Sequence, residues 1–486
     1  MNQKDIASER MLIGGELVES ISGKWDDSIN PATGEVIGHS PAGDQADVAR
    51  AVLAAEQAWP KWFALQPKER AEVLRTLGER LRQRAEELLR VEVLDTGNTV
   101  NSLRMDVGMS IDSLNYYAGL AYEVKGETIP GVLENLHLTL REPYGVVVRI
   151  APFNHPLMFA VARTAAALAA GNAVIVKPPE TSPLSSLVLS EIARDVFPPG
   201  VFNVVTGRGA TVGDALVRHP AIKRIAFIGS VATGRAIQKA AAESGVKHVS
   251  LELGGKNPMI VFPDVDLDAA ARAAVAGMNF AWQGQSCGST SRLLLHADIH
   301  DAVLERVVQI VSAFKIGDPM DPAFNAGPLN SAAQLAKTQK YIEVGKQDGA
   351  RLMTGGKRPV GKYFDRGFWI EPTVFSNVTP AMRIAREEVF GPILSVMRWN
   401  TEDEVVDIAN STEFGLTASI WTNDIHQALR TARRVRSGHQ WINGFSAHYT
   451  GVPFGGFKSS GVGREEGIEE LMSYTEGKSI NIVLRQ

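Results

Sequence analysis

The sequence lacks the features that would tie its 486 residues to an oxidising compartment, a nucleic acid or a membrane surface. Cys287 is the single cysteine, so no internal disulfide can form and folding does not depend on an oxidising environment. Lys and Arg number 50 against 54 Asp and Glu, and this mild acidity disfavours nucleic-acid and anionic-membrane partners. A small-molecule partner remains compatible with this composition.

Long apolar runs are also missing. The most apolar stretch, residues 164–176, is rich in alanine and too short to cross a bilayer. The first residues, MNQKDIASERMLIGG, contain no continuous apolar segment after their charges, which predicts no secretory signal. The 10 histidines are scattered without an HExxH motif, so no metal site is predicted. We therefore expect a soluble, cytoplasmic protein.

The apolar pattern changes along the chain. Residues 47–59 and 68–94 carry apolar side chains at helical spacing. From residue 146, short apolar runs alternate with amphipathic helices, which is typical of an α/β fold with a parallel sheet covered on both faces. A second alternating series starts at Pro258. The runs of the first series are VVVRIAPF (146–153), AVIVKP (173–178), VFNVVTG (201–207), IAFIGS (225–230) and VSLEL (249–253).

Two segments fit neither series. Residues 125–144 and 470–486 contain extended, alternating patterns that predict strands of a small separate sheet. Separated strands have edges that must be covered, and a second copy of the chain can cover them. We therefore expect a homodimer or a homotetramer.

The segment GQSCG, residues 284–288, holds the sharpest chemical signal. A thiolate is a good nucleophile towards a carbonyl, and flanking glycines let the backbone approach a ligand closely. The alternative is that Cys287 is a small buried apolar residue.

Two further polar residues stand at strand ends. Glu252 ends an apolar strand before two glycines, where burial should raise its pKa and suit it to act as a general base; alternatively it caps a turn or pairs with Lys256. Asn154, in PFNHP, lies between a strand and a helix, where its amide can stabilise an oxyanion. Its alternative is a simple turn or helix cap.

Signals for a dinucleotide are weaker. The glycines of 207–213 form only a loose GxGxxxG pattern after a strand. Gly229 and Ser230 mark another strand-to-helix turn, where a helix N-terminus can hold a pyrophosphate. Lys177 and Glu180 follow a strand end and can bind ribose hydroxyls, although Glu180 can equally cap the next helix.

Together these segments resemble the aldehyde dehydrogenase superfamily over nearly the full length of the chain, within its hydrolytic, betaine-aldehyde-like or general bacterial branches. The resemblance implies a Rossmann-type cofactor domain (1–124 and 145–255), an α/β catalytic domain (256–455) and an oligomerisation sheet (125–144 and 470–486). The matching segments are PFNHP, VIVKPPE, FIGSVATG, LELGGKNP, GQSCGS, EEVFGPIL, FGLTASIW and PFGGFKSSGVGREEG.

The resemblance also implies roles. Cys287 would attack an aldehyde, Asn154 would hold the oxyanion, and Glu252 would activate the water that hydrolyses the thioester. Arg163 and Glu465 occupy places of a proton-relay pair, with a surface arginine and a helix cap as alternatives. The cofactor would be NAD, with NADP also open, because the Glu180 carboxylate favours a free 2′-hydroxyl over a 2′-phosphate. The residues implied in cofactor binding are Lys177, Glu180, Gly229, Ser230, Glu388 and Phe390.

The expected substrate tunnel departs from the family pattern. Many relatives carry aromatic residues at the places of His155, Ala162 and His448. We expect these three, with Met109 and Phe454, to line a widened tunnel for a polar or aromatic aldehyde. The alternative is that backbone groups satisfy both histidines.

Two rival functions remain open from sequence. An acylating dehydrogenase passes its thioester to coenzyme A, but that branch typically lacks the glutamate at the place of Glu252. A non-catalytic relative would have lost its nucleophile, whereas this chain keeps Cys287.

Overall fold

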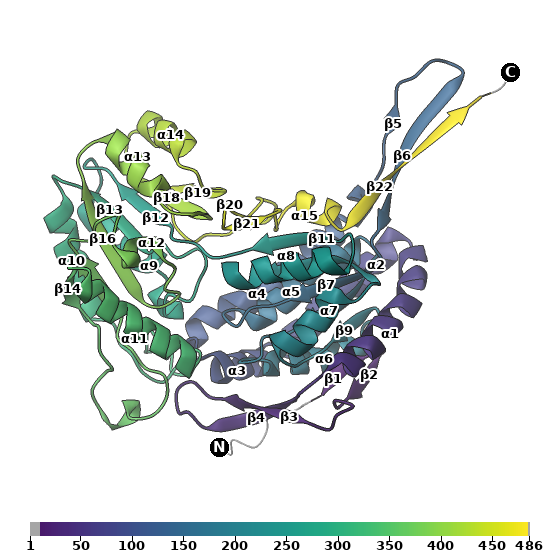
Figure 1. Cartoon of the computed structure of the whole chain (residues 1–486), viewed down its shortest axis with the longest axis horizontal. Helices are drawn as coiled ribbons and strands as arrows, with labels where there is room; N and C mark the ends of the chain where they lie inside the picture. The colour runs from purple at the N-terminus through teal and green to yellow at the C-terminus, as the bar shows by residue number, and fades with distance from the viewer. Residues whose placement is uncertain (1–9, 485–486) are drawn as a thin grey trace.

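The computed structural model describes residues 10–484 and contains two large sheets and a projecting arm (Figure 1). The first sheet has eight strands in the order β2-β1-β9-β8-β7-β10-β11-β21, and its five central strands are parallel. Among the five parallel strands, β7 comes first in the sequence. Strands β8 and β9 follow on one side of it and β10 and β11 on the other, so the strand order reverses between β7 and β10. Ligands of such sheets bind beside that reversal, at the carboxyl ends of the strands. The strands are β1 (Met11–Ile13), β2 (Glu16–Val18), β7 (Val146–Ile150), β8 (Ala173–Lys177), β9 (Phe202–Val204), β10 (Ile222–Ile228), β11 (His248–Glu252) and β21 (Gly461–Val462).

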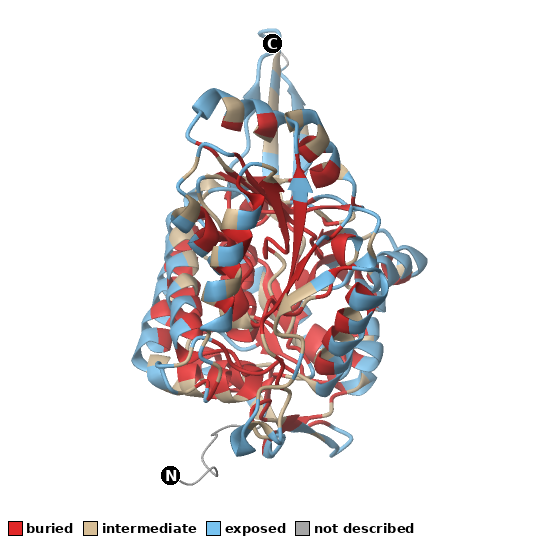
Figure 2. Ribbon diagram, turned by 90° about the vertical axis from the view of Figure 1, so that its left-hand side faces the viewer, coloured by how far each residue is buried: buried red, intermediate tan, exposed pale blue. Residues whose placement is uncertain are grey.

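Both faces of this sheet are covered by helices. Figure 2, viewed from the side of the second sheet, shows the same arrangement there, with buried strands between helices whose outer faces are exposed. Successive residues of a strand point to opposite faces. In β7, Val147 packs with α2, α4, α5 and α6, whereas Val146 and Val148 pack with α1, α7 and α8. This double burial explains the continuous apolar runs of the sequence. The helices are α1 (Gln45–Ala64), α2 (Pro67–Gln83), α3 (Ala85–Thr96), α4 (Val100–Gly119), α5 (Pro156–Ala169), α6 (Leu184–Arg194), α7 (Asp214–Arg218) and α8 (Val231–Ser244).

The second sheet has seven strands in the order β14-β15-β16-β13-β12-β18-β19, parallel except for β14. Two apolar clusters cover its two faces. Its strands are β12 (Pro258–Val261), β13 (Arg292–His296), β14 (Arg351–Thr354), β15 (Thr373–Ser376), β16 (Ile393–Trp399), β18 (Thr417–Trp421) and β19 (His439–Ile442). Its helices are α9 (Leu267–Gly277), α10 (His300–Ser312), α11 (Ala332–Gln347), α12 (Arg383–Arg386), α13 (Glu402–Asn410) and α14 (Ile425–Arg434).

The arm is a three-stranded antiparallel sheet that projects from the body, with β6 between β5 and β22 (Figure 1). Apolar side chains are exposed on it, including Leu133, Leu136, Leu140 and Ile482. Its strands are β5 (Thr128–Ile129), β6 (Asn135–Pro143) and β22 (Thr475–Val483). The remaining elements are β3 (Trp25–Ile29), β4 (Val36–Pro41), β17 (Phe414–Gly415), β20 (Phe457–Lys458), α15 (Ile468–Met472), single 3-10 turns at 121–123, 280–282 and 362–364, and a π turn at 209–213.

The predicted strand–helix alternation is confirmed, with two details that sequence did not give. The helical pattern of 68–94 forms two helices, because the chain turns at Arg84 between α2 and α3. Strand β21 lies beyond the three predicted domain ranges and pairs with β11 of the first sheet. The functional assignment of the ranges stays a prediction.

Within residues 10–484, no helix combines the length and apolar character needed to cross a membrane. The same residues contain no group of three or more His, Cys, Asp or Glu side chains placed to hold a metal ion.

Candidate active site

The residue pair at the centre of the site comes from the two sheets. Glu252 is the last residue of β11, and the short segment 253–257 connects it directly to β12 of the second sheet. Cys287 lies in the loop that leads into β13, the neighbour of β12. Both side chains line one cavity of about 820 Å³. The structure therefore brings together the predicted nucleophile and the predicted base.

The Cys287 loop is held in an unusual backbone conformation. Asn279, Gln283 and Gly284 all have positive φ, at 57°, 54° and 63°. A β-carbon on Gly284 would come within 2.4 Å of the Gly391 carbonyl oxygen, so no larger residue fits there. Strain of this kind concentrates at functional sites, where surrounding contacts maintain it.

Asn257, the first residue after the connecting glycines and Lys256, fixes this loop. Its amide nitrogen donates to the Cys287 carbonyl at 2.7 Å and to the Ser289 carbonyl at 3.0 Å. Its amide oxygen accepts from the Thr417 backbone nitrogen at 3.0 Å. Asn257 is buried, so these bonds form without competition from water. It thereby ties the nucleophile loop to both β12 and β18.

Burial disfavours the charged forms of both Cys287 and Glu252 and so raises both pKa values. Burial raises the pKa of the Glu252 carboxyl to about 7, and the charge of Glu465 acts in the same direction. Burial, followed by the charge of Glu252, raises the pKa of the Cys287 thiol well above its usual range. A resting thiol is a poor nucleophile, so attack requires a nearby base, and Glu252 is the carboxyl of the cavity that acts most strongly on the Cys287 thiol. The alternative pairing of Glu252 with Lys256 is not seen, because the Lys256 ammonium is buried without a hydrogen-bond partner.

Asn154 lies beyond the end of β7, at the same carboxyl edge as Glu252. The sheet register places Ile150 beside Phe227 and Ile228 beside Glu252. Asn154 is buried; its backbone carbonyl accepts from the Asn98 amide at 2.9 Å, and its own amide oxygen has no partner. Helix α5 begins at Pro156 without a side-chain cap from the residue before it. Asn154 itself is not among the residues that line the cavity.

Arg163 and Glu465, predicted as a relay pair, are in contact but belong to a larger buried network. The Arg163 Nε lies 3.0 Å from Glu465, and its Nη2 bonds Glu466. The Nη1 atom of Arg149 also lies 2.7 Å from Oε1 of Glu465. Both alternatives from sequence are wrong: Arg163 is buried rather than on the surface, and Glu465 is bound by two arginines rather than capping a helix.

Most of the residues expected in the substrate tunnel lie around this cavity, whose role as the tunnel stays a prediction. Met109, His155, His448 and Phe454 all line it. The prediction for Ala162 is wrong: this residue packs in an apolar cluster with Met158 and Phe159, and those two longer side chains of α5 reach the cavity instead. An alanine methyl group is too short to extend past such neighbours.

The two cavity histidines are bound by carboxylates, so the alternative that backbone groups satisfy them is wrong. The Nδ1 atom of His155 lies 2.7 Å from Asp106, and that of His448 lies 2.8 Å from Glu466. The histidine side chains are 13% and 29% exposed, and their carboxylate partners are 5% and 9% exposed. Both imidazoles are therefore oriented from behind by a nearly buried acid.

Four predicted cofactor residues share the carboxyl edge of the first sheet. Lys177 ends β8, Gly229 follows β10, and Ser230 caps α8 by accepting from the Thr233 backbone nitrogen at 3.2 Å. Burial lowers the pKa of Lys177 to about 8, and the charge of Glu180 opposes this shift. Glu180 is exposed and accepts from the Gly209 nitrogen at 3.1 Å, rather than capping the next helix.

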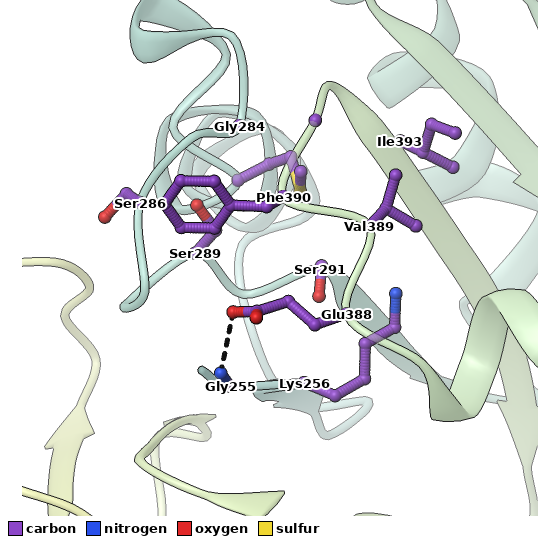
Figure 3. Close-up of a pocket in the computed structure, with 12 residues that line it drawn as sticks. Gly255, Lys256, Gly284, Ser286, Ser289, Ser291, Glu388, Val389, Phe390 and Ile393 are labelled. Carbon is purple, nitrogen blue, oxygen red and sulfur yellow. Dashed lines mark hydrogen bonds between the residues drawn. The ribbon is translucent and has the colours of Figure 1, made fainter. Parts of the chain in front are cut away.

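Glu388 and Phe390 border a small pocket beside the Cys287 loop (Figure 3). The Glu388 carboxylate accepts from the Gly255 nitrogen at 2.9 Å, and burial raises its pKa. A β-carbon on Gly254 would lie 2.1 Å from the same carboxylate, which explains the glycine there. Phe390 has a positive φ of 54° and meets Phe153 edge to face, with ring centroids 5.6 Å apart.

Sequence reasoning missed three residues that shape the site: Asn257, Asp106 and Glu466. Asn257 stands within the LELGGKNP segment, so its place beside Glu252 was the available signal. Glu466 directly follows Glu465 in PFGGFKSSGVGREEG, so its segment was also a signal. Asp106 gave none, because it acts through His155, 49 residues away in the chain.

Comparisons with known proteins agree with this geometry. The model of the aldehyde dehydrogenase family matches residues 18–480. Aldehyde dehydrogenase tropH of Talaromyces stipitatus is 46% identical over 477 residues, covering 95% of this chain and 92% of that protein.

Solved structures give the same result. The crystal structure of a putative aldehyde dehydrogenase from Burkholderia cenocepacia has a TM-score of 0.96 at 41% identity and covers 98% of both chains. PnpE from Pseudomonas sp. WBC-3 has a TM-score of 0.96 at 40% identity and covers 99% of this chain and 98% of that one. The structure of PnpE in complex with nicotinamide adenine dinucleotide gives the same values. The chain belongs to the aldehyde dehydrogenase family.

Proposed function

We propose that this enzyme oxidises an aldehyde to the carboxylic acid with NAD as electron acceptor, through a thioester on Cys287. The observation that carries the proposal is the shared cavity of Cys287 and Glu252. It combines a nucleophile with a carboxyl group of raised pKa, and an apolar enclosure admits a small-molecule aldehyde.

The first step is attack by the Cys287 sulfur on the aldehyde carbon. Glu252 accepts the thiol proton, directly or through water, because the thiol pKa lies well above its usual range. The new carbon–sulfur bond gives a thiohemiacetal whose oxygen carries negative charge. The Asn154 amide and the Cys287 backbone N–H donate hydrogen bonds to that oxygen.

The second step removes two electrons from the substrate. When bound, NAD would supply a hydride acceptor, and loss of hydride from the former aldehyde carbon would leave a thioester on Cys287. After Glu252 has passed on the thiol proton, it takes a proton from water, and the resulting hydroxide attacks the thioester carbon. The carbon–sulfur bond breaks and the sulfur takes the proton back from Glu252, which gives the acid and the free cysteine. Arg163 and Glu465 lie next to this path and provide a route for the proton to leave.

The residues present fit NAD. Lys177 and Glu180 offer a cation and a carboxylate to ribose hydroxyls, while Gly229, Ser230 and the N-terminus of α8 suit the pyrophosphate. Glu388 offers a second carboxylate to the other ribose, and Phe390 borders the nicotinamide position beside the Cys287 loop. The Glu180 carboxylate favours NAD, with NADP as the weaker alternative.

A direct test records NADH formation with a panel of aldehydes, each with NAD and with NADP. Turnover that disappears in Cys287→Ala, with unchanged melting temperature, supports the proposal. Turnover that requires coenzyme A would favour an acylating enzyme instead. Tight NAD binding without Cys287-dependent turnover of any aldehyde would contradict the proposal.

The arm supports a homodimer or homotetramer as the functional form. Its apolar side chains Leu133, Leu136 and Leu140 are exposed in the single chain, and a second copy of the arm would bury them. The lone cysteine, which needs no oxidising compartment, supports a cytoplasmic location.

A further inference from the structure

The cavity wall carries two imidazole rings that each contact a carboxylate in the same way. His155 and His448 each have Nδ1 against a carboxylate, at 2.7 and 2.8 Å. A carboxylate only accepts hydrogen bonds, so Nδ1 carries the hydrogen in both rings. In the neutral ring, Nε2 then offers a lone pair, and no hydrogen bond to either Nε2 forms within residues 10–484. The cavity thus presents two hydrogen-bond acceptors that lack a donor.

Aromatic side chains surround these acceptors. The His155 ring lies 5.6 Å from Phe159 and 5.7 Å from Trp282, and the His448 ring lies 4.8 Å from Phe454. All of these residues line the cavity. Such walls favour a planar, apolar substrate body, because aromatic rings gain energy from offset and edge-to-face contacts.

We propose, on the basis of the proposed function, that the substrate is an aromatic aldehyde carrying a hydroxyl group, which donates to Nε2 of His155 or His448. A phenolic hydroxyl supplies the donor that both rings lack, and its ring fills the apolar walls. Asp106 and Glu466 are positioning residues, because they act by fixing which imidazole nitrogen faces the substrate.

An aldehyde with a carboxylate at its far end fits this wall less well. A carboxylate cannot donate to Nε2, and the acids behind both rings repel its charge. Arg163 is already shared by Glu465 and Glu466. The remaining arginine of the cavity, Arg272, is exposed to solvent, where an ion pair contributes little.

The test compares 4-hydroxybenzaldehyde with benzaldehyde by the ratio of their kcat/KM values. His448→Phe removes one acceptor and leaves Glu466 paired with Arg163. The double variant Asp106→Asn/His155→Phe removes the other acceptor without leaving a buried charge unpaired. One phenolic hydroxyl donates one hydrogen bond, so the variant that removes the acceptor in use should lower the ratio about 3- to 10-fold. An unchanged ratio in both variants would overturn the inference. His426→Phe, at an exposed position of α14, is the matched control and should leave the ratio unchanged.

A second measurement separates this inference from the proposed function. Equilibrium binding of 4-hydroxyacetophenone and acetophenone needs no turnover, since a ketone is not oxidised to an acid. Preference for the hydroxylated ketone, lost in the same histidine variant that lowers the ratio, supports the inference even if no aldehyde is oxidised. Equal binding of the two ketones, or a preference of the enzyme for 4-carboxybenzaldehyde that depends on Arg272, would overturn it while leaving aldehyde oxidation intact.

Discussion

The amide nitrogen of Asn257 donates a 2.7 Å hydrogen bond to the backbone carbonyl of Cys287. Through this bond, the segment that connects the two sheets fixes the loop of the nucleophile. Replacing Asn257 with Ala removes a hydrogen-bond partner from the Cys287 carbonyl and the Thr417 backbone nitrogen, whereas the Ser289 carbonyl keeps its bond from the Ser291 nitrogen. We expect a loss of about 2–4 kcal/mol in stability and a fall in kcat of at least about tenfold.

Thermal denaturation and steady-state kinetics measure these two effects. Asn400→Ala is the matched control, because the side chain of Asn400 makes one exposed contact with Glu404. Unchanged melting and turnover in the Asn257 variant would show that the loop holds its own shape.

Asn154→Ala tests the oxyanion role. Loss of one donor to an oxyanion typically lowers the rate about 10²–10³-fold. The residue has one backbone bond to Asn98, which the substitution keeps, so the variant should fold. Turnover close to wild type in a folded Asn154→Ala enzyme rules out the role.

The pKa of Glu252 predicts a pH dependence. Burial raises this pKa to about 7, and only the deprotonated carboxylate can take a proton from water. Thioester hydrolysis should therefore fall about tenfold for each pH unit below 7 and level off above it. The rate can be followed without NAD by acylating Cys287 with a 4-nitrophenyl ester and recording deacylation from pH 5 to 9.

Glu252→Gln provides the control for this profile. The amide cannot accept the proton, so deacylation should slow by about 10²–10⁴-fold and lose its dependence on pH. A wild-type profile retained in the glutamine variant would assign the titrating group elsewhere.

Glu180 is expected to set the choice between NAD and NADP. Its carboxylate is exposed at the edge of the first sheet, where it repels a 2′-phosphate. Glu180→Ala should raise the ratio of kcat/KM for NADP to that for NAD by about tenfold, which corresponds to about 1.4 kcal/mol. An unchanged ratio would mean that Glu180 does not face the adenosine ribose.

The exposed apolar side chains of the arm predict where charged substitutions would dissociate the proposed oligomer. Leu136 and Ile482 are register partners on β6 and β22, and they are 39% and 38% exposed in the single chain. The double variant Leu136→Lys/Ile482→Lys places charges where an interface would bury apolar groups, at a cost of roughly 1.5–3 kcal/mol per side chain. Light scattering after size exclusion should show a smaller species, whereas Leu429→Lys on α14 should not; an unchanged mass in the double variant would place the interface elsewhere.

Much of the fold was predictable because strands buried on both faces leave continuous apolar runs, as in β7, β8 and β10. The chemical groups were predictable for a different reason: Cys287 and Glu252 each stand in a segment with a glycine that has no room for a β-carbon, Gly284 and Gly254 respectively. The failure at Ala162 shows the limit, since lining a cavity depends on whether neighbouring side chains reach farther.

The sequence by itself determined the layers of the fold, the candidate nucleophile and the order in which the candidate reactive groups occur along the chain. Only the tertiary structure decided whether the pKa of each carboxyl group is raised or lowered. Glu387 and Glu388 are neighbours, yet Arg383 lowers the pKa of Glu387 to about 2, whereas burial raises that of Glu388. The orientation of the His155 ring likewise depends on Asp106, and that of the His448 ring depends on Glu466. Burial and charge act through distances in space, and residues far apart in the sequence set those distances.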